Sequence, residues 1–243
     1  MGNTGASLPA YEGAIDYFFN TLVPIDPEDP IHPSFIFSDD FTGGTLDTDL
    51  WTYVDPLGDA SSSMTGTNVE IGVAAGFPEH DTWTGTENTT PRLMQEANDR
   101  SFEIEIKLDS MPIGSYAAHG LIVEQDSDDF FQFYIYSWES TLRLYADKVV
   151  AGLVTELTNT AITGDISGVP MYLRLTRVGD DWYQWYSDDG STWLGGYTFT
   201  HPMTVTSVGL FVGNESSGGA DPPAFTGSFD YFFNTAAPID PQD

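Results

Sequence analysis

The chain has 243 residues, of which 40% are hydrophobic and 14% aromatic, enough to fill a core and to exclude disorder along its whole length. Its 37 acidic and 7 basic residues give a formal net charge of −30, which repels phosphate backbones, so nucleic acid is not an expected partner. There is no cysteine and no apolar run of about 18 residues, so the sequence predicts no disulfide, no thiol nucleophile and no membrane insertion. Abundant Asp, with lysine only at Lys107 and Lys148, is typical of a secreted or cell-surface protein in a salty or calcium-rich medium.

The first predicted element lies in a segment that recurs at the other end of the chain. Residues 13–29 match residues 227–243 at 12 of 17 positions. Because the copies begin 214 residues apart (227 − 13), the repeating unit is a whole domain rather than a solenoid unit. We therefore predict that residues 1–30 are the C-terminal strand and linker of a preceding repeat copy, and that residues 31–243 are a complete domain with a trailing linker. The strand at 13–20 would then pack on this domain, pair with another molecule or compete with its own near-copy.

The remainder of the chain is a series of short segments in which apolar and polar residues alternate, as expected for strands. No segment has the periodicity of an amphipathic helix of useful length. Turn residues separate the segments, and the Ser-Asp-Asp-Gly sequence at 187–190 is typical of a hairpin turn. This number and spacing of strands predicts an all-β fold, a two-sheet antiparallel β-sandwich. The predicted strands are Phe35–Phe41, Val69–Val73, Phe102–Leu108, Gly120–Gln125, Phe130–Tyr136, Leu142–Tyr145, Tyr172–Val178, Trp182–Ser187, Trp193–Phe199, Ser207–Val212 and Phe225–Phe233.

Several motifs occur in an order that can be compared with a known family. They are Phe-Ser-Asp-Asp-Phe at 37–41, Trp51, Gly-Leu-Ile-Val-Glu-Gln-Asp at 120–126, Tyr-Leu-Arg-Leu-Thr-Arg at 172–177, Trp182 and Val-Gly-Leu-Phe at 208–211. In this order they resemble the concanavalin A-like and laminin-G-like jelly rolls, over roughly residues 34–234. The resemblance implies a jelly-roll sandwich. It implies no single function, because this fold hosts glucanases, lectins, adhesion modules and carbohydrate-binding modules.

The resemblance also implies a metal site. In sandwiches of this kind a structural calcium ion often joins the first strand to the last, and the matching positions here are Asp39, Asp40 and Asp230. Calcium takes six to eight oxygen ligands, which carboxylates and backbone carbonyls supply. The alternative is that these aspartates cap turns or are solvated.

A second group of residues has the composition of a sugar site, which combines an aromatic face with polar groups for hydroxyls. If neighbouring strands bring them together on one concave sheet, they form a glycan groove. The alternative for Arg92 is an ion pair with a buried carboxylate such as Glu124. The candidate ligand-binding residues are His80, Asp81, Trp83, Arg92, Gln95, Glu124, Gln132, Tyr134 and Trp138.

One strand carries acidic residues that can be compared with a glycosidase motif. Glucanases of the resembling fold carry their catalytic acids on one strand as Glu-x-Asp-x-(x)-Glu, and the nearest match is Glu103, Glu105 and Asp109. The middle residue is Glu, and the last is an Asp that lies too far along the strand. A solvated strand face, with Lys107 as the counter-charge, accounts for the pattern equally simply.

These observations lead to a functional prediction. We predict a non-catalytic carbohydrate-binding module, not an enzyme, from a tandem array in a secreted or cell-surface protein. Its partners would be a polysaccharide or other glycan and neighbouring repeat copies, with structural calcium as the cofactor. The alternative is a structural or adhesive repeat that assembles by strand addition between copies, and a glycoside hydrolase is the third candidate.

Overall fold

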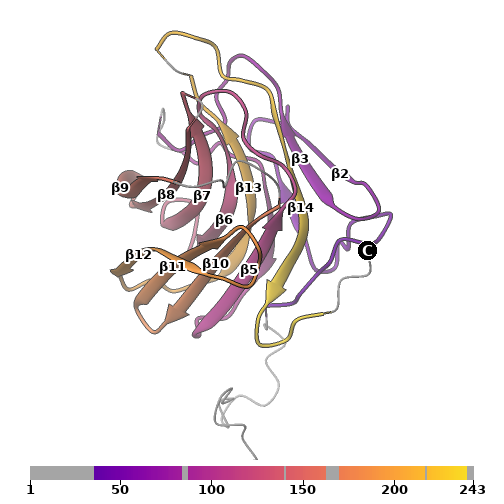
Figure 1. Ribbon diagram of the computed structural model, residues 1–243, viewed down its shortest axis with the longest axis vertical. Coiled ribbons are helices and arrows are strands. Elements are labelled where there is room, and N and C mark those ends of the chain that lie inside the picture. Colours follow the sequence, from indigo (N-terminus) through magenta and orange to yellow (C-terminus); the bar gives the residue numbers. More distant parts are fainter. Residues whose placement is uncertain (1–35, 84–86, 140, 163–169, 217, 240–243) are drawn as a thin grey trace, which may run out of the picture. The chain divides into compact units, whose positions relative to one another are not determined.

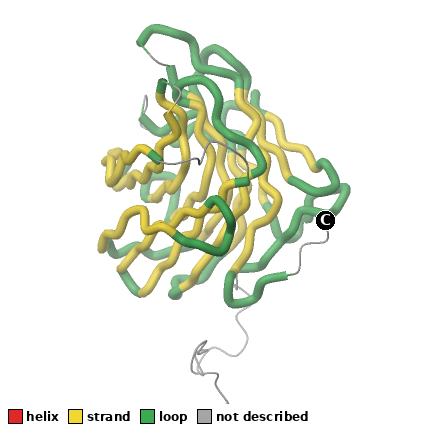
Figure 2. Tube along the Cα trace, in the orientation of Figure 1, coloured by secondary structure: helices red, strands yellow, loops and turns green. Residues whose placement is uncertain are grey.

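The computed structural model describes residues 36–83, 87–139, 141–162, 170–216 and 218–239. These residues form strands and loops without any helix (Figure 2). In particular, this part of the chain has no helix of the length and apolar character needed to cross a membrane. The predictions for residues 1–30, including the strand at 13–20 and the contact with repeat copies, lie outside the described residues and remain predictions.

Within the described residues, fourteen strands form two antiparallel sheets of seven that face each other as a sandwich (Figure 1). The first sheet has the spatial order β1 (Thr52–Val54), β4 (Arg92–Glu96), β13 (Ser207–Asn214), β6 (Ala117–Glu124), β7 (Phe130–Trp138), β8 (Thr141–Val150) and β9 (Leu153–Ala161). The second sheet has the order β12 (Leu194–Thr200), β11 (Asp181–Ser187), β10 (Met171–Val178), β5 (Phe102–Leu108), β14 (Phe225–Asn234), β3 (Val69–Val73) and β2 (Ser61–Met64). The predicted all-β, two-sheet sandwich is thus confirmed.

The main core lies between the sheets and is built by the alternation of strand residues. Phe131, Phe133 and Ile135 of β7 are fully or almost fully buried in it. Trp182 of β11 packs edge-on against Phe131, with 5.0 Å between ring centroids. The aromatic residues that cross from one sheet to the other therefore hold the sandwich together.

A second apolar cluster covers the opposite face of the first sheet. It consists of Met94, Ile122, Phe130, Tyr134, Tyr136, Tyr145, Val149 and Phe211. These residues alternate with the core residues on β4, β6, β7, β8 and β13. Both faces of this sheet are therefore largely buried, and the second cluster forms the base of the site described below.

Ten of the eleven predicted strands are present, and one prediction is wrong. Between residues 36 and 41 only Asp39 is paired, as an isolated bridge to Phe232. Asp39 and Asp40 interrupt the extended chain because their carboxylates accept backbone N–H groups two residues ahead, from Phe41 and Thr42. Phe41 consequently has a positive φ of 52°.

The sequence also failed to predict β1, β2, β4 and β9. The first two are short, and β9 (Leu153–Ala161) is polar on much of its length. β2, β4 and β9 pair with the predicted strands β3, β13 and β8, and β1 pairs with β4, so tertiary pairing rather than local preference forms them.

Candidate functional site

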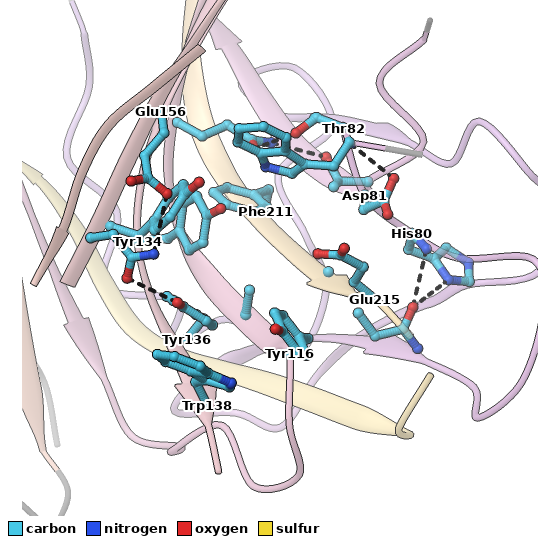
Figure 3. Close-up of a pocket in the computed structure, with 18 residues that line it drawn as sticks. His80, Asp81, Thr82, Tyr116, Tyr134, Tyr136, Trp138, Glu156, Phe211 and Glu215 are labelled. Atoms are coloured by element: carbon cyan, nitrogen blue, oxygen red, sulfur yellow. Dashed lines mark hydrogen bonds between the residues drawn. The ribbon is translucent and has the colours of Figure 1, made fainter. Parts of the chain in front are cut away.

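A cavity of about 340 Å³ opens on the outer face of the first sheet, above the second apolar cluster (Figure 3). Its base is formed by tyrosines from adjacent strands, because Tyr134 of β7 lies opposite Tyr145 of β8. The rings of Tyr134 and Tyr145 are 4.9 Å apart, and that of Tyr136 is 5.4 Å from Tyr145. Packed aromatic rings give the cavity a rigid apolar wall with hydroxyl groups at its edge.

One wall depends on a two-residue antiparallel bridge between His80 and Asn214. The His80 N–H donates to the Asn214 carbonyl at 3.1 Å, and the Asn214 N–H donates to the His80 carbonyl at 3.0 Å. Asp81 and Glu215, the residues that follow the bridged pair, both line the cavity.

The buried side chains of this bridge form a second hydrogen-bonded layer. The Asn214 amide donates to the carbonyls of Ala74 and Pro223, which identifies its oxygen as the acceptor for the His80 backbone and ring. The other ring nitrogen of His80 is 2.9 Å from Asp59 Oδ1. Both ring nitrogens of His80 are thus engaged within the protein, and this residue positions the wall rather than offering a free ring nitrogen to a ligand.

Glu215 is the titratable group with the clearest chemical consequence. Burial, together with the negative charges of Asp81 and Glu79, raises its pKa to about 7. Figure 3 shows the Glu215 side chain pointing into the space between Phe211 and Tyr116. The cavity therefore contains a carboxyl group that retains its proton close to neutral pH, beside an ionised carboxylate.

The opposite wall is polar. Glu156 of β9 is exposed and accepts a hydrogen bond from the Asn159 amide at 3.2 Å. Tyr136 donates its hydroxyl to Asn159 Oδ1 at 2.9 Å. In Figure 3, Glu156 and Glu215 lie on different sides of Phe211, and they come from β9 and from the residue that follows β13.

Exposed aromatic rings complete the entrance. Trp83 and Trp138 are each 39% exposed, which leaves ring surface for a ligand. Tyr116 stacks on Tyr136 with an interplanar angle of 27°. Such rings bind the apolar C–H face of a pyranose, while the carboxylates and amides bind its hydroxyls.

The structure brings six of the nine predicted ligand residues to this cavity and places three elsewhere. The six that line it are His80, Asp81, Trp83, Gln132, Tyr134 and Trp138. Arg92 instead forms an ion pair with Glu124, with Nε 2.7 Å from Oε1, which was the alternative considered from the sequence. Gln95 projects to the other side of β4 from Arg92, where its amide bonds the backbone N–H and carbonyl of Phe37. Neither the ion pair nor Gln95 borders the cavity.

The three predicted calcium ligands are engaged in local interactions. Asp39 accepts the Trp51 indole N–H at 2.8 Å, Asp40 accepts the Thr42 hydroxyl at 2.8 Å, and Asp230 pairs with Lys107. The described part of the chain contains no group of three or more His, Asp or Glu side chains arranged to hold a metal ion. Calcium binding stays a prediction from the resemblance.

The acidic residues of β5 lie apart from this cavity. Glu105 accepts Arg174 Nη2 at 2.6 Å and the Tyr231 hydroxyl at 2.6 Å, and Glu103 accepts the Thr176 hydroxyl at 2.7 Å. These groups lie on the outer face of the second sheet, where Glu103 lines a second cavity of about 380 Å³ together with Arg174 and Trp193. The alternative of a solvated face with Lys107 as the counter-charge does not describe Glu105, which is buried and pairs with Arg174, while Lys107 pairs with Asp230.

Sequence reasoning missed Glu156, Asn159, Tyr116 and Glu215, all of which line the cavity. Glu156 and Asn159 belong to a strand that was not predicted. Glu215 lies three residues beyond the predicted strand Ser207–Val212, in a short polar stretch without a motif. Only the bridge between two distant segments reveals its relation to Asp81.

A scan against models of protein families and a search of curated proteins found no match. Among solved structures, a functionally unknown protein from Saccharomyces cerevisiae aligns with 76% of this chain and 97% of its own, with a TM-score of 0.60 and 14% identity. A xylan β-1,4-xylosidase from Bacillus halodurans C-125 aligns over 84% of this chain and 40% of its own, with a TM-score of 0.60 and 20% identity. A GlcNAcα1-4Gal-releasing endo-β-galactosidase from Clostridium perfringens aligns over 84% and 63%, with a TM-score of 0.55 and 14% identity.

These comparisons contradict two predictions from the sequence, that the chain is a non-catalytic carbohydrate-binding module and that it is not an enzyme. Both neighbours with a stated activity are glycoside hydrolases. At identities of 14–20%, the likeness establishes the shared fold. The chain spans less than two thirds of the length of either hydrolase chain.

Proposed function

We propose that this protein is a glycoside hydrolase and that the cavity on the first sheet is its active site. The observation that carries the proposal is the pair of Glu215 and Asp81 in an aromatic cavity. Hydrolysis of a glycosidic bond requires one carboxylic acid that protonates the leaving oxygen and a second, ionised carboxylate. Glu215 has a pKa raised to about 7 and is the proton donor, and Asp81 is the ionised partner whose charge contributes to that shift.

The roles follow from the chemistry of the reaction. Glu215 transfers its proton to the glycosidic oxygen as the bond from that oxygen to the anomeric carbon breaks. Asp81 stabilises the positive charge that develops on the sugar ring, either by attack on the anomeric carbon or by activating a water molecule. The hydroxyl group of the leaving sugar retains this proton, and a water molecule then reprotonates Glu215.

The remaining groups of the cavity are suited to holding a polysaccharide. Trp83, Trp138 and Tyr116 offer ring surface for stacking, and Glu156 and Asn159 offer acceptors and donors to hydroxyl groups. The xylosidase and the endo-β-galactosidase named above support a carbohydrate substrate, since they share the fold and act on carbohydrates.

The finer fold assignment belongs to the same proposal. We infer a jelly roll of the concanavalin A-like type, in a secreted or cell-surface protein. It is supported by sheet neighbours that are distant in sequence, such as β14 between β5 and β3, and β13 between β4 and β6. The sequence motifs at 37–41 and 120–126 support it independently.

The test is hydrolysis of a polysaccharide panel by the full chain. The panel contains xylan, arabinan, galactan, mixed-linkage glucan and a mucin-type glycan, and the readout is released reducing sugar. The wild type should hydrolyse at least one of them, and Glu215→Gln and Asp81→Asn should each reduce the rate about 100-fold or more. Glu96→Gln is the matched control, because Glu96 is exposed on β4 outside the cavity. Activity that survives in both cavity variants would refute the assignment.

A further inference from the structure

The cavity of about 380 Å³ on the second sheet is not used by the proposed reaction. Its base comes from β5, β10 and β11, which are neighbours in that sheet (Figure 1). On β10, Leu173 and Leu175 belong to the main core, so the alternating Arg174 and Thr176 point outward. The residues that line the cavity are Glu103, Arg174, Thr176, Tyr183, Trp185 and Trp193.

Two rows of side chains cross this face, because residues in register on neighbouring strands lie side by side. In the first row, Trp185 of β11 is opposite Arg174 of β10, which is opposite Glu105 of β5. The second row has the same strand order and consists of Tyr183, Thr176 and Glu103. Each row therefore has an aromatic ring at one end and a carboxylate at the other.

Arg174 is held between a carboxylate and a tryptophan ring. Its Nη2 donates to Glu105 Oε2 at 2.6 Å, and its Cζ is 3.8 Å from the centroid of the Trp193 ring. Trp193 lies between β11 and β12, outside both strands. The ion pair fixes the guanidinium, and the cation–π contact holds the Trp193 ring against it. The ring is thus oriented before any ligand arrives.

The Trp185 ring is left uncovered by the edge strand next to it. Its register partner on β12 is Gly195, and a Cβ added at Gly195 would be 3.6 Å from Trp185 Cζ3. Because glycine has no side chain, β12 does not cover the ring at this point. Tyr183, Trp185 and Trp193 are all partly exposed, so aromatic surface is available to a ligand.

The polar groups of the cavity indicate what kind of ligand fits it. Glu103 accepts the hydroxyls of Thr176 at 2.7 Å and Thr235 at 3.0 Å, and its side chain is 33% exposed. A carboxylate accepts about four hydrogen bonds, so capacity remains for a ligand hydroxyl. Glu103 and Glu105 supply two carboxylates for the single guanidinium of Arg174, which disfavours an anionic ligand, and the net charge of −30 acts in the same direction.

We propose that this cavity is a second glycan-binding site, which holds a neutral polysaccharide by stacking on Trp193 and Trp185 and by hydrogen bonding to Glu103. The choice of a glycan rests on the proposed function, and the position of the site rests on the geometry. The two cavities lie on the outer faces of opposite sheets, with the main core between them. A polymer held here is therefore anchored to the protein away from the proposed catalytic pair, which raises its effective concentration at the first cavity.

The experiment is affinity electrophoresis of the full chain in native gels that contain arabinoxylan, galactan or mixed-linkage glucan, with polygalacturonate as the anionic comparison. Glu215→Gln is the parent protein, so that hydrolysis does not consume the polymer, and at least one neutral polymer should retard it. Trp193→Ala and Trp185→Ala, each added to the parent, should raise the dissociation constant about 10-fold. Trp193→Phe keeps an aromatic ring and should bind more tightly than Trp193→Ala. Phe37→Ala is the matched control, because Phe37 is an exposed aromatic residue outside both cavities.

Four outcomes overturn the inference. They are no retardation by any neutral polymer, unchanged dissociation constants in both folded alanine variants, Trp193→Phe binding no more tightly than Trp193→Ala, and an effect of the alanine variants on polygalacturonate alone. Folding is checked by the far-ultraviolet spectrum, and Trp185→Ala decides the matter if Trp193→Ala does not fold. Absence of hydrolysis by the wild type would refute the proposed function and leave this binding test intact.

Discussion

Gly213 lies so close to His80 that a Cβ atom at position 213 would be 2.7 Å from the His80 carbonyl oxygen. Real Cβ atoms essentially never approach backbone so closely, so only glycine permits the bridge between His80 and Asn214 at its observed geometry. The bridge in turn brings Asp81 and Glu215, which are 134 residues apart (215 − 81), to the same cavity. A single glycine thus determines whether the proposed catalytic pair can form.

The first prediction concerns this glycine. Gly213→Ala should lower the free energy of unfolding by about 1–3 kcal/mol, because the backbone must move to accept the methyl group. It should also reduce hydrolysis by at least about 10-fold, since Asp81 and Glu215 separate. Gly44→Ala is the control, because a Cβ at Gly44 meets no atom within 4 Å. Urea unfolding and reducing-sugar release measure the two effects, and a fully active Gly213→Ala protein would contradict the prediction.

The second prediction concerns the buried layer behind the bridge. His80→Ala should cost about 1–3 kcal/mol of stability, because it removes a buried ring and its contact with the Asn214 oxygen, which keeps only the backbone N–H of residue 80. Asp59→Asn should cost only about 0–1 kcal/mol, because the Asp59 side chain is 42% exposed. The two variants are compared by urea unfolding. Equal losses in both would show that the exposed ion pair, rather than the buried amide, stabilises this wall.

The third prediction concerns the main core. Phe232 is fully buried on β14, and its ring lies edge-on to Trp51 with centroids 5.3 Å apart. Phe232→Ala should lower the free energy of unfolding by about 3–5 kcal/mol through lost contacts and the cavity left behind. Leu153→Ala is the control, because Leu153 is 74% exposed and should change stability by less than about 0.5 kcal/mol. A small effect of Phe232→Ala on urea unfolding would place β14 outside the structural core.

The fourth prediction concerns stability against pH. The pKa of Glu215 is raised in the folded protein, so its unfolded form loses a proton at lower pH than its folded form. The contribution of Glu215 to the free energy of unfolding is therefore complete below about pH 4.5 and is lost as pH rises through about 7. Glu215→Gln does not undergo this loss. Its free energy of unfolding should therefore rise relative to that of the wild type by about 1–2 kcal/mol between pH 4 and 8, a value that allows for solvent screening of a partly exposed group. A difference in unfolding free energy that is independent of pH would contradict the raised pKa.

Much of the fold was predictable because period-2 alternation is strong on strands such as β3 and β5, whose bounds were predicted to the residue. Weakly patterned strands could not be predicted in this way. For example, β9 has few apolar residues and depends on pairing with β8. The strand prediction at residues 36–41 was wrong for a different reason. Its apolar and polar residues alternate, but Asp39 and Asp40 bond the backbone ahead of them and turn the chain.

The site was predictable only in part. Trp83, Tyr134 and Trp138 could be identified from residue type, because aromatic residues near polar groups are typical of sugar sites. Glu215 could not, because its raised pKa arises from burial and from Asp81, which joins it only through long-range pairing. The charge of Arg92 was a misleading signal, because that residue neutralises Glu124 within the sheet.

The pH dependence of kcat/KM tests the central claim most directly, using whichever polysaccharide in the panel is hydrolysed fastest. Glu215 must carry a proton to act as the acid, so the rate should fall as pH rises through about 7. The falling limb should disappear along with the activity in Glu215→Gln. A rate that stays constant from pH 5 to 9, or the absence of hydrolysis of every polysaccharide in the panel, would contradict the account.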